Sequence, residues 1–245
     1  MTRRPLEELI DTLDPAWRLV QEWIAGARNH VEVLPVDQAR GADTLLRLQV
    51  TSRAVLGAVA LETGGILVDH GWLRFLGSGH ARVRGTLLTW NGMGERADEH
   101  PLSGALVVAD DVVGGFFALN GGAFPGKQGD ASYLAPDMLR WEGLAMSYSQ
   151  LLHWALTGDL AKFYETLRWP GWEADAAALP DDKGFSIYPP LWAREGGAVG
   201  ERSRRPVPVA ELWRLHRDWA DQLRDLPDGS EVQLVLEDGP NRLVE

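Results

Sequence analysis

The glycine-rich stretch from Gly121 to Lys127 comes nearest to a motif of known chemistry. It has the spacing of a phosphate-binding P-loop, in which two glycines with four residues between them precede a lysine. Such a loop needs Ser or Thr at the next position to hold Mg²⁺, and a helix whose N-terminus meets the phosphates. The next residue here is Gln128, and a turn and a strand are predicted over residues 130–136. The stretch is therefore interpreted as a hairpin loop, and no nucleotide cofactor is expected.

Asp69 and His70 end an apolar run beside a turn glycine, Gly71. Neighbouring side chains on a strand point to opposite faces, so these two are not expected to share a site as neighbours. Either residue could meet a distant partner such as His80 or Glu142. The six histidines include no pair at helical metal-ligand spacing, and the chain has no cysteine. No metal site is expected.

Two tryptophans, Trp169 and Trp172, bracket a Pro-Gly turn. Their rings could stack on a sugar or a base, or they could hold the end of a helix against a sheet. The second interpretation is favoured, because a buried indole contributes a large apolar area.

Two charged groups have simpler interpretations. Asp110 and Asp111 lie between apolar runs and are interpreted as a turn of the form Asp-Asp-x-x-Gly-Gly. Arg202, Arg204 and Arg205 form a basic cluster in an acidic chain. That cluster could grip an anion or an acidic partner, and a solvated loop is the default interpretation.

Composition excludes several functional classes. The 245 residues carry a formal net charge of −11, and the long-range field of such a chain repels nucleic acids. No run of about 18 apolar residues is present, so no membrane span is expected. The absence of cysteine favours the reducing cytoplasm as the location.

The chain is predicted to begin with a helix and to continue as short strands. Asp14 is the expected N-cap and Pro15 the first helical residue. Strands are expected over residues 31–34, 44–50, 55–61, 66–69, 72–76, 105–109 and 115–119. No helix-length amphipathic pattern separates these runs, which favours an antiparallel sheet over parallel crossovers.

Helices are predicted again after Glu142. Ser147 and Gln150 have the spacing of a capping box, and Gly158 ends that helix. Asp159 is expected to cap a further helix that reaches residue 168. The last helix opens at Pro208, and residues 232–236 are a final strand that could join the sheet. Residues 175–208 are expected to be a loop-rich lid or linker. The prediction is one α+β domain over residues 1–245, a mostly antiparallel twisted sheet flanked by N-terminal and C-terminal helices.

Several stretches carry a family resemblance. The main ones are Asp14–Trp17, Leu48–Val59, Gly64–Arg74 and Gly114–Gly121, with further matches from residue 134 to residue 142 and from residue 162 to residue 172. Over most of its length the chain resembles the bacterial family called domain of unknown function 2625, a resemblance that implies no activity. The path through Trp141 and Glu142 into the helix start at Ser147 is similar to the SUKH (Smi1/Knr4-like) superfamily. That similarity implies a binding role of the toxin-immunity or adaptor type.

The leading hypothesis is a non-enzymatic binding protein whose acidic surface suits a basic partner such as a nuclease toxin. The alternative is an enzyme or small-molecule-binding protein with a pocket around Asp69, Trp72 and Asn120, which lie at predicted turns. A third hypothesis, a structural subunit of an oligomer, predicts melting that depends on protein concentration. The candidate ligand- or partner-binding residues are Asp69, His70, Trp72, Asn120, Glu142, Trp169 and Trp172.

Overall fold

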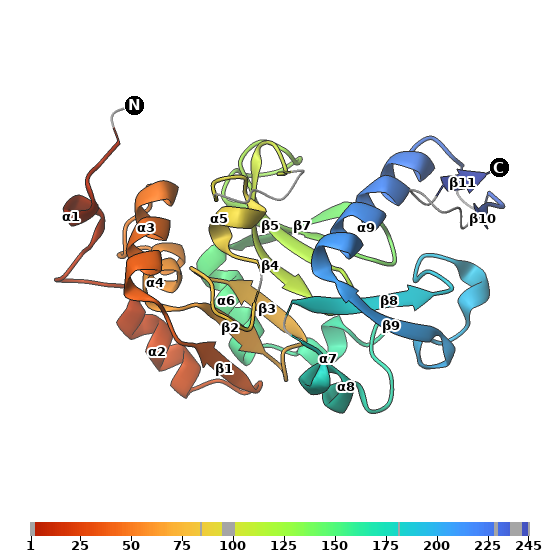
Figure 1. The fold of residues 1–245 in the computed structure, drawn as a ribbon, viewed down its shortest axis with the longest axis horizontal. Coiled ribbons are helices and arrows are strands. Elements are labelled where there is room, and N and C mark those ends of the chain that lie inside the picture. The colour runs from red at the N-terminus through yellow and green to blue at the C-terminus, as the bar shows by residue number, and fades with distance from the viewer. Residues whose placement is uncertain are drawn as a thin grey trace.

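A seven-stranded antiparallel sheet forms the centre of the structure (Figure 1). The computed structural model describes residues 3–83, 85–94, 101–180, 182–227, 230–235 and 242–244. The strands pair with one another in the order in which they follow along the chain, and each neighbouring pair is antiparallel. They are β1 (Val31–Leu34), β2 (Gly65–Val68), β3 (Leu73–Leu76), β4 (Ala105–Asp111), β5 (Phe116–Asn120), β6 (Asp130–Leu134) and β7 (Trp141–Ser147). The predicted α+β class with a mostly antiparallel sheet is confirmed.

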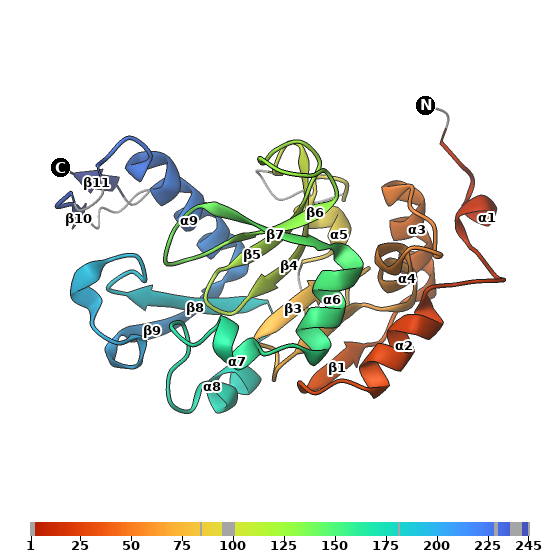
Figure 2. The same cartoon turned by 180° about the vertical axis from the view of Figure 1, so that it is seen from behind.

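Helices flank the sheet on both faces. They are α1 (Leu6–Leu9), α2 (Trp17–Ala25), α3 (Gln38–Leu48), α4 (Val55–Glu62), α5 (Leu87–Trp90), α6 (Tyr148–Thr157), α7 (Leu160–Phe163), α8 (Trp172–Ala178) and α9 (Val209–Leu223). α2, α3 and α4 gather beside β1 and β2, and the views from opposite sides place α9 and α6 on opposite faces (Figures 1 and 2). None of the described helices is long and apolar enough to cross a membrane.

Two neighbouring phenylalanines of β5 show why the central strands are apolar on both sides. Phe116 packs against Trp213 of α9, with 4.7 Å between ring centroids, and Phe117 packs on the other face against Phe163 of α7. Both phenylalanines are completely buried. A sheet covered on both faces selects nearly continuous apolar strands, and the run Phe-Phe-Ala-Leu in β5 satisfies that demand.

Two strand predictions near the N-terminus are wrong. Residues 44–48 of the first run lie in α3 and the whole of the second run, residues 55–61, lies in α4, so helices do separate β1 from β2. α4 is buried at six of its eight positions, so it lacks the polar face that would reveal a helical period. An apolar run of this length reads equally well as a buried strand.

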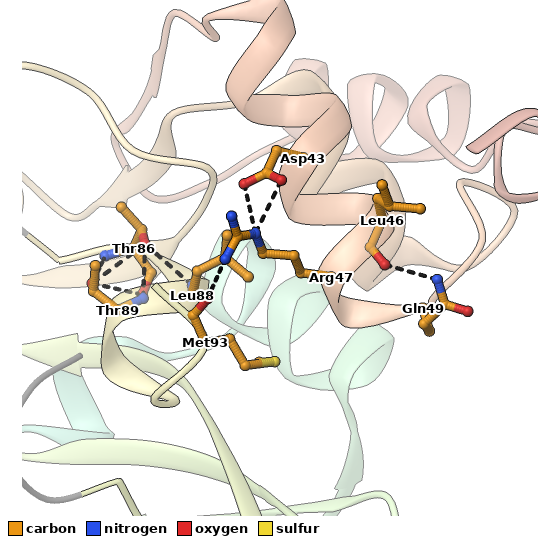
Figure 3. Close-up of polar contacts among 8 residues, drawn as sticks. All are labelled: Asp43, Leu46, Arg47, Gln49, Thr86, Leu88, Thr89 and Met93. Atoms are coloured by element: carbon orange, nitrogen blue, oxygen red, sulfur yellow. Dashed lines mark hydrogen bonds and ion pairs between the residues drawn. The ribbon is translucent and has the colours of Figure 1, made fainter. Parts of the chain in front are cut away.

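The ends of α3 are set by local polar contacts. The side chain of Asp37 caps its first turn by accepting a hydrogen bond from the amide of Arg40. At its other end Gln49 takes a left-handed conformation, and its side-chain amide donates to the carbonyl of Leu46 at 2.7 Å. Figure 3 shows this contact and shows Arg47 reaching from α3 to the carbonyl of Met93, at 2.9 Å. α3 is thereby tied to the segment that follows α5.

Other boundaries also differ from the predictions. The first long helix begins at Trp17, with Ala16 and not Asp14 at the N-cap position. Asp159 does cap a helix, but α7 ends at Phe163 well before residue 168. By contrast, the capping box of Ser147 and Gln150 at the start of α6 is confirmed, as is the helix that follows Pro208.

The segment expected to be loop-rich holds a second sheet. It contains part of α8 and a hairpin of β8 (Lys183–Tyr188) and β9 (Ser203–Pro208), with the short helices η1 (Arg194–Gly196) and η2 (Val199–Glu201) between the strands. The amide of Phe185 donates to the carbonyl of Val112 at 2.6 Å, which docks this hairpin beside the main sheet. Farther along, β10 (Gln233–Val235) pairs with β11 (Arg242–Val244) and not with the main sheet, and residue 236 of the predicted strand lies outside the described residues.

Candidate functional site

Four aromatic side chains meet where the connection between α7 and α8 lies against the sheet. Trp72 is at the centre, and its ring centroid lies 5.2–5.5 Å from those of Tyr164, Trp169 and Trp172. Trp72 and Tyr164 are completely buried and Trp169 is nearly so. We call these four residues the tryptophan cluster. The four rings pack against one another and leave no open pocket between them. This packing holds the α7–α8 connection against the sheet.

Arg168 adds a charge to the tryptophan cluster. Its guanidinium carbon lies 3.7 Å from the ring centroid of Trp172 and 4.9 Å from that of Trp72. The same guanidinium forms an ion pair with the carboxylate of Asp69, and both side chains are largely buried. The guanidinium thus meets ring faces on one side and a carboxylate on the other, while its buried Nε has no hydrogen-bond partner among the described residues.

The turn between β2 and β3 brings His70 to the edge of this cluster. Asp69 and His70 have positive φ angles of 55° and 60°, a conformation that few non-glycine residues adopt. The ring of His70 stacks on that of His30, with centroids 4.6 Å apart, and meets Trp172 edge-on. The partners of His70 are therefore His30 and Trp172. Five of the seven candidate residues come together here: Asp69, His70, Trp72, Trp169 and Trp172.

Asn120 lies apart from them, at the start of the β5–β6 loop. Its side-chain oxygen accepts hydrogen bonds from the amides of Gly122 and Phe124, at 2.9 and 3.1 Å, and its amide group donates to the carbonyl of Phe124 at 2.9 Å. The loop joins two antiparallel strands, so its interpretation as a hairpin loop is confirmed. The side chain of Asn120 organises its own loop.

A cleft of about 710 Å³ lies on the other side of the α7–α8 connection. Its walls come from the β6–β7 turn, from residues 165–168 and 170, and from residues 191 and 197–202. They include two arginines, Arg168 and Arg202, and three acidic residues, Asp137, Glu165 and Glu201. In the described part of the chain, none of these three carboxylates forms an ion pair. We call this hollow the acidic cleft.

The seventh candidate, Glu142, acts on the acidic cleft through Asp137. Glu142 is exposed on β7, the last strand of the main sheet, and forms an exposed ion pair with Arg140 at 3.4 Å. Burial raises the pKa of Asp137, and the neighbouring charge of Glu142 raises it further. The charged form of Asp137 is therefore less favoured in the folded chain than in water.

Two of the three arginines of the predicted basic cluster have contacts within the protein, while the third, Arg205, is exposed. The guanidinium of Arg202 donates to carbonyl oxygens of the loop after β8, among them those of Pro189 at 3.2 Å and Gly197 at 3.1 Å. Arg204 stacks on Trp169, with 4.4 Å between its guanidinium carbon and the ring centroid. Arg202 lines the acidic cleft, and Arg204 also donates to the carbonyl of the cleft residue Val199, so both guanidinium groups are already engaged within the chain.

The predicted turn of the form Asp-Asp-x-x-Gly-Gly is present between β4 and β5, where the carbonyl of Asp111 accepts a hydrogen bond from the amide of Gly114 at 3.2 Å. Asp110 and Asp111 themselves are the last two residues of β4, and both are buried. Asp110 forms an ion pair with Arg74 at 2.5 Å. Asp111 accepts hydrogen bonds from the hydroxyl of Tyr133 at 2.7 Å and from the amide of Gly115 at 2.8 Å. Burial raises the pKa of Asp111 to about 6, although these hydrogen bonds oppose the shift. With no route to solvent, this group fits a structural role better than a catalytic one.

Sequence reasoning did not find the acidic cleft. Asp137, Glu165 and Glu201 are single acidic residues in three separate segments, and Arg168 carries no motif. The buried pair at Asp110 and Asp111 did leave a signal, since two charges inside a long apolar run must find partners if the run is a strand. Among the described residues, no group of three or more histidine, aspartate or glutamate side chains is arranged to hold a metal ion.

Comparison with known proteins gives a family and no activity. A family model described as "Protein of unknown function DUF2625" matches residues 6–212. A protein of Escherichia coli (strain K12), YbfG, described as uncharacterized, is 41% identical over 212 residues, which are 86% of this chain and 95% of that relative. An uncharacterized protein of Haemophilus influenzae is 37% identical over 204 residues, or 83% of this chain and 90% of the relative. No solved structure matches the chain.

Proposed function

The chain belongs to the DUF2625 family, and from its geometry we propose that it is a non-enzymatic module that binds a basic segment of another protein in the acidic cleft. The carrying observation is that three cleft carboxylates, those of Asp137, Glu165 and Glu201, have no ion-pair partner among the described residues. The arginines beside them are already engaged by Asp69 and by backbone carbonyls. A cationic side chain of a partner protein would give these carboxylates the ion pairs that they lack within the chain.

Electrostatics favours such a partner. Asp137 has a raised pKa because it is partly buried and lies near Glu142, so its charged form is held at a cost in the free protein. A cation placed in the cleft lowers that cost, and the net charge of −11 attracts basic proteins from a distance.

The apolar part of the cleft suits the stem of a long basic side chain. Leu167, Pro170, Leu191 and Val199 line it together with the carboxylates. Lysine and arginine bury their methylene stems against apolar surface while the charged head meets a carboxylate. The combination supports a protein partner of the immunity or adaptor kind, in the cytoplasm that the cysteine-free composition favours.

The proposal is tested with a variant in which neutral amides replace the cleft carboxylates. The variant D137N/E165Q/E201Q removes the three carboxylates and keeps their shape, and E7Q/E8Q/E22Q removes three exposed carboxylates from the opposite end of the molecule (Figure 1). Binding of a synthetic peptide of alternating arginine and glycine is measured by titration calorimetry at physiological salt. Since an exposed ion pair contributes about 0.5–1 kcal/mol, we expect the cleft variant to bind about tenfold or more weakly. The control should lose less than threefold, and an equal loss in both variants would contradict the proposal.

The alternative of a small-molecule pocket around Asp69, Trp72 and Asn120 has less support. Trp72 is completely buried and Asp69 is held by Arg168. Asn120 uses its side chain within the β5–β6 loop. No observation favours an enzymatic role over the binding role.

A further inference from the structure

Arg168 is held differently from the other arginines of the described structure. Its guanidinium carbon lies within 5.1 Å of three ring centroids, those of Trp172, Trp72 and Tyr164. The carboxylate of Asp69 completes the enclosure, and the arginine side chain is 8% exposed. Arg204 and Arg217 each lie over one ring, and Arg202 is held by backbone carbonyls.

We propose that Trp72, Tyr164, Trp172 and Asp69 form a guanidinium-binding site whose resident ligand is the chain's own Arg168. Faces of aromatic rings attract cations, and the attraction is strongest where water is excluded. The site selects a guanidinium over an ammonium, because a flat cation can stack on Trp172 while its edge meets a carboxylate. The 3.7 Å separation from the Trp172 ring is a stacking distance.

The carboxylate is positioned by contacts that do not involve the arginine. The amide of Asp69 donates to the carbonyl of His30 at 2.7 Å, and its carbonyl accepts from the amide of Trp72 at 3.1 Å. The tight turn with its positive φ angles therefore presents the carboxylate toward the rings whether or not Arg168 is there. A site built in advance loses little conformational entropy when it takes a ligand.

This site works as a latch between distant parts of the chain. Asp69 and Arg168 are 99 residues apart, and their pairing ties the β2–β3 turn to the α7–α8 connection. Leu167 and Pro170, on either side of the latch, form part of the wall of the acidic cleft. The latch goes beyond the proposed binding function and does not depend on it.

Arg168→Ala empties the site, and methylguanidinium is the probe that should refill it. We expect the thermal midpoint of R168A to fall and then to rise saturably as methylguanidinium is added. At ten times its dissociation constant, the probe should raise the ratio of folded to unfolded protein about elevenfold. Methylammonium at the same ionic strength should give little of this effect. R202A, which removes an arginine that has no aromatic enclosure, should not respond to either compound.

An equal response of R168A to both compounds, or of R168A and R202A to methylguanidinium, would overturn the proposal. A second measurement covers the case in which R168A does not fold. In the wild-type chain, an arginine-specific dicarbonyl reagent should modify exposed Arg53 at least tenfold faster than Arg168. In D69N, Arg168 should gain reactivity at least threefold, while D14N leaves it unchanged. Unchanged reactivity in D69N would show that the carboxylate does not hold the guanidinium. Both readouts are independent of peptide binding, so failure of the latch and failure of the proposed function remain distinguishable.

Discussion

Replacing Asp111 by Asn should remove a stabilising contribution that grows as the pH falls from 7 to 5. Asp111 is completely buried in β4, and burial raises the pKa of its carboxyl to about 6, from 3.8 in the unfolded chain. The folded state therefore binds this proton more tightly than the unfolded state does. The stabilising contribution is fully present below pH 3.8 and is lost as the pH rises through about 6. Asn keeps the shape of the side chain and can still accept from the amides of Val113 and Gly115.

The size of the effect follows from the two pKa values. At pH 7 the carboxyl is ionised in both states and adds almost nothing to the pH dependence. At pH 5 it is mostly protonated in the folded state and ionised in the unfolded state, which stabilises the fold by about 1.3 kcal/mol relative to pH 7. The free energy of unfolding of the wild-type chain minus that of Asp111→Asn should therefore rise by this amount.

The wild-type chain must be compared with Asp111→Asn because another buried group, His216, has the opposite effect on the pH dependence of stability. Burial lowers the pKa of His216 to about 4, from 6.5, so its folded form resists protonation. Between pH 7 and pH 5 this histidine should destabilise the fold by about 2 kcal/mol. His216 is unchanged in both proteins and cancels in the comparison, so the net curve of the wild-type chain is not a test of Asp111.

Urea unfolding of both proteins at pH 7, 6 and 5 measures the difference. Parallel curves would refute the reasoning, because they would mean that Asp111 has the same pKa in both states. Tyr133→Phe gives a second check. The hydrogen bond from Tyr133 lowers the pKa of Asp111, so its loss should move the titration of the carboxyl to higher pH.

Three further predictions concern stability. Gly115→Ala places a Cβ about 2.2 Å from a carboxylate oxygen of Asp111 and should lower the thermal midpoint strongly, while Gly143→Ala, with open space around it, should not. Arg74→Met leaves the buried carboxylate of Asp110 unpaired and should cost about 3–5 kcal/mol in urea unfolding; a cost below 1 kcal/mol would contradict the ion pair. Ser147→Ala removes the N-cap of α6 and should cost about 1 kcal/mol by the same assay, with no loss expected if the helix is fixed by packing alone.

The strands that sequence predicts correctly are those bounded by turn signals. Gly64–Gly65 mark the start of β2, and Gly114–Gly115 separate β4 from β5. Glycine pairs of this kind mark chain reversals whatever lies around them, because their backbone freedom is a local property. The strand boundaries that these glycine pairs predict are therefore the same in the folded structure.

The helices α3 and α4 show where local information ends. α4 is buried on nearly every side, since it packs among α2, α3 and α6. Its sequence therefore does not indicate which side of the helix faces the core. A short helix buried on all sides has the same apolar pattern as a buried strand. α3 has a polar face and a capping Asp37, but residues 44–50 also fit the loose alternation of apolar and polar residues that predicts a strand.

The candidate site also has a part that local sequence signals predict and a part that they do not. The turn at Asp69 and the tryptophans near Pro170 were found because unusual residues sit beside strong turn signals. The acidic cleft was not found, since its carboxylates come from three segments that only the folded β8–β9 hairpin and the β6–β7 turn bring together. Spacing along the chain holds no information about such a meeting.

The position of the latch explains why the tryptophan cluster and the acidic cleft lie next to each other. Residues 165–170 have one side in the tryptophan cluster and the other in the acidic cleft, with Arg168 turned toward Asp69 and Glu165 exposed. An arginine left free at this position would neutralise the cleft carboxylates. Arg168 does line the cleft, but its guanidinium is held by the aromatic rings and Asp69, and it forms no ion pair with the described cleft carboxylates. The stability of the connection and the charge of the cleft therefore depend on the same side chain, and D69N should weaken both.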